Sequence, residues 1–485
     1  MNAPAINTKR LFTASRIAVV ATAARFVAIS AMMAPLKGCF GLDNEQVGWI
    51  GGAGLWGFTL TMLLFGSLCD LFGMKLVFRL AVLAHLAGAM AMCLANGFVM
   101  LLGGSLLLSM GDGLVQAAGN PLVVTLFPDR KTEMMNKFHL WFPGGIVICG
   151  LIAFALDKAV PDVWQAKLAM VFVPTVLYGA MFLGQRFPTT ERVQLGVSFG
   201  QMFRETFFRP LFLLLALCMM MTASIELGPN TWLTPVLESA GIPGILVLVW
   251  VSLLMALLRQ LAGPMVRKLA PLGILLCSAV LSGLGLLGLS YSHNLVTALA
   301  AGTVFAVGVA YLWPTMIGIT SERVPKGGAL ALAMMGSVGM VAVGLITVPM
   351  MGRVADGHIH EHLPVRETTM CLQHIVETYP ALMRQAQGRS GDDLRQALEA
   401  AQAALAGRTA AGVLPEPQAV AALRSAIAAA PQSEAAQTAR RLIGPAETYG
   451  GQVAFRKVAL LSIILAAIFG LLCINDRIRG GTLPG

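Results

Sequence analysis

Charged residues are scarce in this chain of 485 residues: they make up 12% of it, whereas 56% of the residues are hydrophobic. A soluble globular domain carries about 25% charged residues. The mean hydropathy is accordingly high, at +0.75. This composition excludes an ordinary soluble fold and predicts an all-α protein that lies in the lipid bilayer.

The chain also lacks the residue spacings that mark metal sites and catalytic centres. Its eight cysteines are scattered, and six of them fall in long apolar stretches. Cys39 and Cys371 fall outside those stretches; a disulfide between them stays open, but two unrelated thiols are favoured because nothing local fixes their approach. No nucleophile–base pair and no metal motif occurs at membrane depth, so we expect neither an enzyme nor a bound metal or cofactor.

One histidine cluster lies in a polar stretch, at His358, His360 and His362, with Glu361 between them. Alternating histidines without cysteine partners or an i,i+4 pair are a weak metal signal. We therefore interpret the cluster as a solvated loop.

Windows of about 20 apolar residues predict twelve transmembrane helices. The even number places both termini on one side of the membrane. Lys9 and Arg10 precede a first apolar run that is too long for a signal-peptide core, so we expect this run to remain as a helix. The windows lie near residues 12–36, 47–69, 76–95, 98–127, 138–156, 164–184, 207–236, 242–265, 271–291, 295–320, 328–352 and 454–474.

Basic residues are distributed unevenly between the two sides. The segments on the side of the termini are rich in lysine and arginine, whereas the short loops on the other side hold only Lys158 and Lys167, apart from Lys37 at one helix end. Cytoplasmic loops are the ones enriched in lysine and arginine. We therefore expect a multi-pass protein of the inner (plasma) membrane with both termini cytoplasmic. The net charge of +10 reflects this topology and indicates no nucleic-acid partner.

The twelve spans form two sets of six, which predicts two six-helix bundles. The Ala-rich stretch between spans eleven and twelve should form an extracytoplasmic helical insert, which serves as a small lid or as a partner-docking surface; the sequence does not choose. The expected units are an N-terminal bundle at 1–185, a cytoplasmic linker at 186–206, helices seven to eleven at 207–352, the insert at 353–452, and helix twelve with a tail at 453–485.

The apolar stretch 98–127 carries three polar residues at four-residue spacing: Asp112, Gln116 and Asn120. Steps of four residues keep side chains on one side of a helix. A carboxyl group facing lipid costs several kcal/mol, so the stripe must face protein or a water-filled cavity. Asp112 either carries a proton or pairs permanently with a neighbour such as Arg25.

A loop signature follows the second span: Gly66-Ser67-Leu68-Cys69-Asp70-Leu71-Phe72-Gly73-Met74-Lys75, and then Arg79. It resembles the signature of the major facilitator superfamily, and this resemblance implies the twelve-helix fold and transport by alternating access. Asp70, Lys75 and Arg79 become candidate gating residues, with Asp70 paired to Arg79 or to a neighbouring helix N-terminus. The superfamily signature usually has a basic residue directly after the aspartate, whereas this chain has Leu71 at that position.

A narrower resemblance covers spans four and five. Gln116-Ala-Ala-Gly-Asn120-Pro121, followed by Asn136, His139 and Gly145, is similar to the fucose/proton symporter-like branch, which handles hexoses and related sugars. Gln116 stands where the branch has its proton-carrying glutamate, and residues 12–36 lack the branch's aspartate. His139 and Phe142 replace a glutamine and an asparagine. Proton coupling therefore does not transfer directly from the branch to this chain.

The candidate site residues come from both halves. The amides of Gln116 and Asn120 suit sugar hydroxyls, or else hold helices together. In span seven, Glu226 and Asn230 share a helix face around Pro229. The resemblance places Glu226 opposite Asp112. Glu226 could then couple an ion, bind the substrate, act as a gate, or form half of a structural ion pair. His139 suits a proton relay. Three tryptophans suit either stacking on a sugar ring or anchoring at the membrane interface: Trp141, Trp232 and Trp313. Arg259 is expected to have a structural role and to pair with an acid.

The sequence thus predicts a monomeric secondary active transporter of a small polar solute, with a monosaccharide as the expected cargo. Coupling to a proton or another ion would run through Asp112 or Glu226. Two alternatives stay open: an uncoupled facilitator of the same solutes, and a transporter-like receptor or scaffold whose insert binds a partner.

Overall fold

The described chain is helical throughout. The computed structural model describes residues 6–478 except 41, 43, 161–162, 360–362, 386–388 and 409–414, and these residues contain no β-strand. Within them, 11 helices are long and apolar enough to cross a membrane, and Gly244–Gln260 is a further, shorter apolar helix. Together they confirm the expected all-α fold with twelve membrane helices.

The N-terminal bundle contains six spans, and the fifth is broken into two helices. Its elements are α1 (Thr8–Phe40), α2 (Asn44–Phe72), α3 (Met74–Cys93), α4 (Phe98–Leu126), α5 (Lys131–His139) with α6 (Trp141–Ala159), and α7 (Ala169–Phe182). Two short linker helices follow, α8 (Glu191–Gln194) and α9 (Phe199–Phe207).

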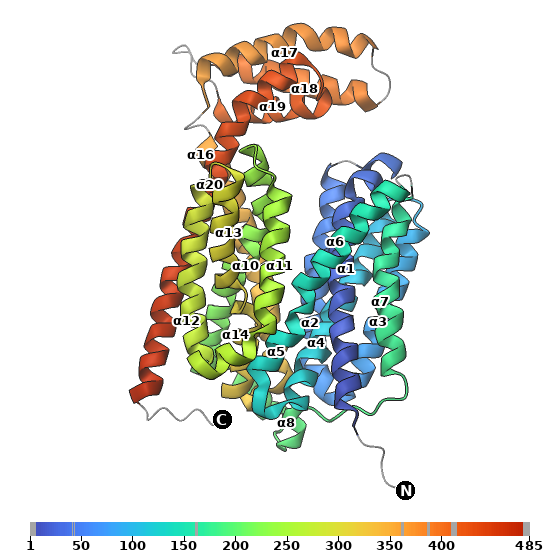
Figure 1. The fold of residues 1–485 in the computed structure, drawn as a ribbon. Helices are drawn as coiled ribbons and strands as arrows, with labels where there is room; N and C mark the ends of the chain where they lie inside the picture. The colour runs from blue at the N-terminus through green and yellow to red at the C-terminus, as the bar shows by residue number, and fades with distance from the viewer. Residues whose placement is uncertain are drawn as a thin grey trace.

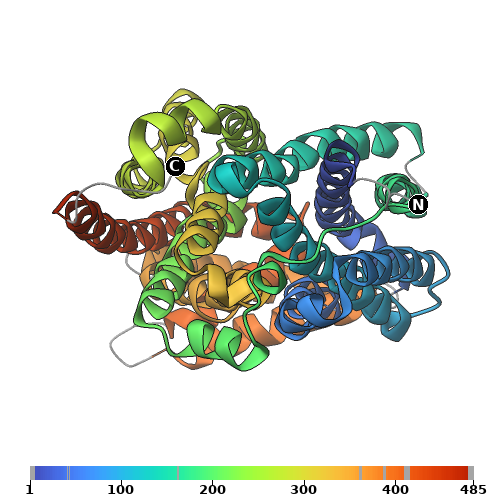
Figure 2. The same ribbon diagram turned by 90° about the horizontal axis from the view of Figure 1, so that it is seen from below.

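The C-terminal bundle repeats this plan. Its elements are α10 (Pro210–Ser239), α11 (Gly244–Gln260), α12 (Ala262–Ser290), α13 (Leu295–Val309) with α14 (Leu312–Arg323), α15 (Gly328–Val341), which continues through a π-helical segment at Ala342–Thr347 into α16 (Val348–Ile359), and α20 (Glu434–Ile478). One span is broken in each bundle, but at different places: α5 and α6 form the fifth span of the N-terminal bundle, whereas α13 and α14 form the fourth span of the C-terminal bundle. Figure 2 shows the two bundles side by side.

Small residues let helices inside each bundle approach closely. A Cβ atom placed on Gly113 of α4 would lie 2.4 Å from the carbonyl oxygen of Phe58 in α2, and one on Gly285 of α12 would lie 2.3 Å from the backbone nitrogen of Phe305 in α13. Without a strong hydrophobic force between helices in lipid, such backbone contacts supply the packing energy. These glycines fix the internal shape of each bundle.

The insert is a separate small helical unit. It consists of α17 (Val365–Gln385), α18 (Arg389–Ala406), α19 (Glu416–Ala429) and the first turns of α20. Its own core includes Leu372, Tyr379 and Leu423 together with Ile443 from α20. Figure 1 shows it at one end of the molecule, with both chain termini at the opposite end; these are called the insert end and the termini end below.

Helix boundaries at the insert differ from the expected positions 353 and 453. The eleventh span continues in α16 to Ile359, and α20 begins at Glu434 and runs unbroken for 45 residues into the membrane span. Polarity changes near 353 and 453, but the helical hydrogen bonding continues, even past Pro445. Arg424 of α19 also binds Asp356 of α16 at 3.2 Å and Glu447 of α20 at 2.7 Å. The insert is therefore fixed to the C-terminal bundle.

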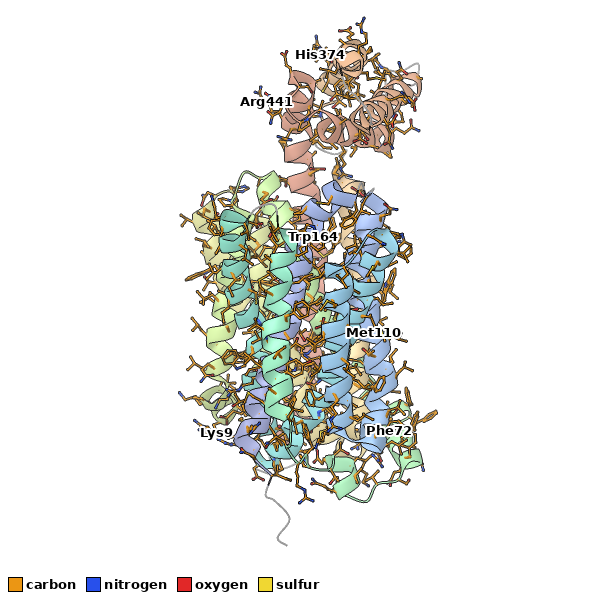
Figure 3. The ribbon with its side chains drawn as sticks, turned by 90° about the vertical axis from the view of Figure 1, so that its right-hand side faces the viewer. Lys9, Phe72, Met110, Trp164, His374 and Arg441 are labelled. Carbon is orange, nitrogen blue, oxygen red and sulfur yellow. The ribbon has the colours of Figure 1, made fainter. Side chains whose placement is uncertain are left out.

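The two bundles contact each other toward the termini end, where α5 lies against α14 and α2 lies against α15. Thr132 of α5 donates to Glu322 of α14 at 2.5 Å, and the Asn136 amide donates to Thr315 at 3.2 Å. Figure 3 places Lys9 and Phe72 at this end, Met110 of α4 near mid-depth, and Trp164 at the insert end. The conformation described here is therefore closed at the termini end.

Candidate functional site

The polar stripe on α4 divides into two environments. Asp112 is fully buried, and its Oδ2 accepts from Arg25 of α1 (Nη2···Oδ2 2.5 Å), while its Oδ1 lies 3.0 Å from Nε2 of His85 in α3. The other ring nitrogen of His85 lies 3.1 Å from the hydroxyl of Tyr178 in α7. The acid is thus paired inside the N-terminal bundle, as in the alternative that named Arg25.

Glycines make this buried network possible. A Cβ on Gly54 of α2 would lie 2.6 Å from the Arg25 guanidinium, and one on Gly111 of α4 would lie 2.3 Å from the His85 ring. Because neither position carries a side chain, Arg25 and His85 have room to reach the same carboxylate. A buried charge needs such pairing, because an unpaired one is strongly destabilising.

The lower part of the stripe belongs to a different cluster. Asn120 lies next to the break between α5 and α6, where its Oδ1 is 3.2 Å from Nε2 of His139. The backbone carbonyl of His139 accepts from Nη1 of Arg259 at 3.0 Å, and Nη2 of Arg259 donates to Oε1 of Glu226 at 2.9 Å. The structure therefore links Asn120, His139, Arg259 and Glu226 into one chain of contacts, called the cross-bundle network below.

The cross-bundle network joins the two halves of the protein. Asn120 and His139 belong to the N-terminal bundle, whereas Arg259 and Glu226 belong to the C-terminal bundle. All four residues are buried, with 1% to 4% of their surface exposed. A buried polar cluster at the interface of two six-helix bundles is where a small solute would bind in such a fold.

Several buried polar atoms around the network have no hydrogen-bond partner of normal geometry within the described residues. They come from two positions on α4 and two on α10, each pair one helical turn apart: Gln116 Oε1, Asn120 Nδ2, Glu226 Oε2 and Asn230 Oδ1. The backbone amide of Trp313 is the other polar group close to the Glu226 carboxyl. Buried polar groups are normally satisfied, so these atoms form a set of donors and acceptors available to a ligand.

The sequence profile of the Major Facilitator Superfamily matches residues 17–353. The chain belongs to this superfamily. It is a multi-pass membrane transporter and not an enzyme. No curated protein sequence matches the chain.

Solved structures of superfamily members share the fold of this transporter at low sequence identity. The E. coli fucose:proton symporter FucP is 15% identical with a TM-score of 0.58, over 72% of this chain and 92% of that one. The proton:xylose symporter XylE is 14% identical with a TM-score of 0.58, over 71% and 89%. A bacterial homologue of the human lysosomal transporter Spinster, in an inward-facing state, is 15% identical with a TM-score of 0.60, over 96% of each chain.

The loop signature of this transporter forms an inter-bundle contact. Gly73 has a φ of 83°, a conformation that favours glycine, in the turn between α2 and α3. Asp70 does not pair with Arg79: its Oδ2 accepts from Nε of Arg192 in α8 at 2.6 Å and lies 3.1 Å from a Cβ built on Gly328, the first residue of α15. The partner that binds Asp70 is therefore Arg192, which is neither of the two expected partners, although the first residue of α15 lies close by.

The basic residues of the signature, Lys75 and Arg79, do not pair with Asp70 in this conformation. Lys75 is half-buried and Arg79 is exposed, and neither forms an ion pair with another described residue. Arg192, which holds Asp70, lies 122 positions away. Its position in the linker gave no local signal, because only the docking of the two bundles brings it to the loop.

The three tryptophans occupy different surroundings. Trp313 packs against the cores of both bundles, so it lies at the interface. Trp141 lies at the start of α6, where the Arg16 guanidinium is 5.6 Å from its ring. Trp232 packs near Gly352 of α16, within the C-terminal bundle. Of the three, Trp313 is next to the cross-bundle network.

Two further expectations concern cysteine and histidine. Cys39 and Cys371 are both free thiols, Cys39 exposed and Cys371 buried in the insert. His360, Glu361 and His362 lie outside the described residues, whereas the His358 ring contacts the carbonyl of Val354. No group of three or more metal-ligating side chains occurs in the described part of the chain.

Proposed function

We propose that this transporter moves a small polar solute, most readily a monosaccharide, by alternating access between its two bundles. The observation that carries the proposal is the set of unsatisfied buried atoms on Gln116, Asn120, Glu226 and Asn230 around the cross-bundle network. Amide and carboxylate groups supply the donors and acceptors that a polyhydroxylated ring needs, and Trp313 offers an aromatic surface beside them.

Proton coupling is part of this proposal, and the pairing pattern favours Glu226 over Asp112 as the acid involved. Both oxygens of Asp112 are engaged by Arg25 and His85, whereas Oε2 of Glu226, beside the candidate site, has no hydrogen-bond partner of normal geometry within the described residues. The neighbours FucP and XylE are sugar:proton symporters by name, which supports the substrate class. An uncoupled facilitator is the alternative mechanism.

We further propose that the transporter is a monomer in the inner membrane with both termini cytoplasmic. Among the short segments that connect the spans, lysine and arginine residues concentrate at the termini end, in agreement with the positive-inside rule, which applies to short loops. In this orientation the closed end of the structure faces the cytoplasm, and the insert stands on the opposite side.

The test is uptake into proteoliposomes that contain the purified full chain. Labelled hexoses, pentoses, nucleosides and organic acids are compared with and without an imposed pH gradient. We expect accumulation of one or more sugars, loss of uptake in Asn120→Ala, and wild-type uptake in Gln260→Ala, which removes an exposed amide at the end of α11.

The outcomes separate the alternatives. If sugar only equilibrates across the membrane, at a rate that does not depend on the pH gradient and is retained in Glu226→Gln, the protein is a facilitator and not a symporter. Absence of uptake for every solute by a folded and inserted protein would overturn the transport proposal and favour a receptor or scaffold whose insert binds a partner.

A further inference from the structure

Arg259 contacts three acceptors that come from three different helical segments. Its Nε donates to the carbonyl of Ala310 at 2.5 Å, its Nη1 to the carbonyl of His139 at 3.0 Å, and its Nη2 to Glu226 at 2.9 Å. Only 2% of its surface is exposed. A guanidinium is the side chain that can satisfy several acceptors in fixed directions at once.

The carbonyl groups of His139 and Ala310 lack an intrahelical donor for the same reason: a proline stands four positions after each of them. In a regular helix the carbonyl of His139 would accept from the residue four positions on, which is Pro143, and the carbonyl of Ala310 would accept from Pro314. Proline has no backbone N–H, so both carbonyls are left without an intrahelical donor. These are also the positions where α5 breaks from α6 and α13 from α14. Arg259 satisfies both proline-freed carbonyls.

From this geometry we propose that Arg259 is a positioning residue that couples the state of Glu226 to the contact between the bundles; the proposal rests on the transport function above. Glu226 and Ala310 belong to the same bundle as Arg259, whereas His139 belongs to the other one. When the bundles separate at the termini end, the bond to Glu226 can persist, but the bond to the His139 carbonyl must break.

The direction of the coupling follows from the burial of the charge. In the closed form the charge of Arg259 is balanced by Glu226, and the groups that face this pair are His139, Tyr311 and the amide of Trp313. A ligand or proton that neutralises Glu226 leaves a buried guanidinium with carbonyl acceptors alone. A buried charge without its partner is strongly destabilising. Opening of the interface to water relieves this cost, so the neutralised site favours separation at the termini end.

The same contact reaches the binding residues of the N-terminal bundle. His139 accepts from Arg259 through its backbone and contacts Asn120 through its ring. A shift of the Arg259 bond therefore displaces the residue that orients Asn120. This arrangement links the candidate binding groups of both bundles to one conformational change.

The experiment measures the separation of the bundles directly. Spin labels are attached to Leu183→Cys at the end of α7 and Lys268→Cys at the start of α12, both exposed, in a full chain whose eight native cysteines are replaced. The end of α7 is held beside the N-terminal segment by Arg10, and α12 contacts α5. The distance between the labels therefore reports opening at the termini end.

The variants are Arg259→Lys, which keeps the charge without the three-way geometry, Glu226→Gln, and the double variant. The matched control is Arg323→Lys, because Arg323 pairs with Asp476 inside the C-terminal bundle. We expect each single variant to raise the ratio of the separated to the closed form by about fivefold or more, the double variant to shift it less than the sum of the singles, and the control to leave it unchanged.

A shift below about fivefold in both single variants, with melting temperatures that show folded protein, would overturn the proposal even where sugar uptake is lost. The distance measurement needs no substrate. If the wild-type protein transports no solute, the transport proposal fails, while the ratio of the two forms still decides the role of Arg259.

Discussion

We expect one methyl group added at the contact between α2 and α15 to shift the equilibrium from the closed form toward the form in which the bundles are separated at the termini end. Gly66 of α2 belongs to the loop signature, and a Cβ on it would lie 2.3 Å from the Cβ of Ala333 in α15. Normal carbon–carbon contact needs about 3.5–4.0 Å, so Gly66→Ala forces these helices apart by more than about 1 Å. Overpacking of this kind costs about 1–3 kcal/mol.

The two helices belong to different bundles, so this cost disappears when the bundles separate at the termini end. At about 1.4 kcal/mol for each tenfold change, the separated form should gain by a factor of about 5 to 150 relative to the closed form. The label pair at Leu183 and Lys268 measures this ratio. The melting temperature of the detergent-solubilised protein measures the stability of the fold.

Two glycine variants serve as controls. A Cβ on Gly88 of α3 would lie 2.7 Å from the backbone nitrogen of Leu108 in α4, inside one bundle. Gly88→Ala should therefore lower the melting temperature without changing the ratio of the two forms. Gly103 has no atom within 4 Å of its Cβ position, so Gly103→Ala should leave both unchanged or raise stability slightly. Lower stability with an unchanged ratio in Gly66→Ala, as expected for Gly88→Ala, would contradict this prediction.

Three further outcomes follow from named contacts. Asp112→Asn leaves Arg25 buried without its counter-charge, so we expect a loss of about 3–5 kcal/mol of stability, seen as a much lower melting temperature; normal stability with lost uptake would instead indicate a coupling role. Arg192→Ala removes the partner of the buried Asp70 and should raise the separated form in the label-distance assay, whereas Arg192→Lys should retain most of the closed form. In the insert, burial raises the pKa of the Cys371 thiol to about 11; at pH 8 it stays protonated, so maleimide labelling detected by mass spectrometry should be slow until the protein is unfolded.

The sequence predicted the features that depend on local pattern. Apolar runs located the twelve spans, because length and hydropathy are local properties. The rarity of charge in these runs made each intramembrane ionisable group informative, and this pointed to the Arg25–Asp112 pair and to an acid partner for Arg259, as the structure has them. Their roles in transport stay predictions.

Other features depend on contacts between distant segments. Arg192 meets Asp70 only after the linker has crossed between the bundles. The early start of α20 at Glu434 was missed because hydropathy reports where lipid begins, whereas helix formation continues into the insert. The π-helical segment at Ala342–Thr347 was also missed; there the Thr347 hydroxyl donates to Ser224 of α10 at 2.6 Å. No spacing in the sequence distinguishes such a segment from an ordinary helix.

The two buried charge clusters of this transporter differ in one respect that decides their expected behaviour. In the N-terminal bundle, each oxygen of Asp112 has a partner within the same bundle, so a rigid-body rotation of the bundles leaves these bonds intact. In the cross-bundle network, the bond from Arg259 to His139 crosses the interface between the bundles, and Oε2 of Glu226 has no partner of normal geometry among the described residues. A group can drive a conformational change only if its interactions differ between the two states. By this criterion we expect the Glu226–Arg259 pair to couple solute or proton binding to transport, and we expect the Asp112 cluster to hold the shape of the N-terminal bundle.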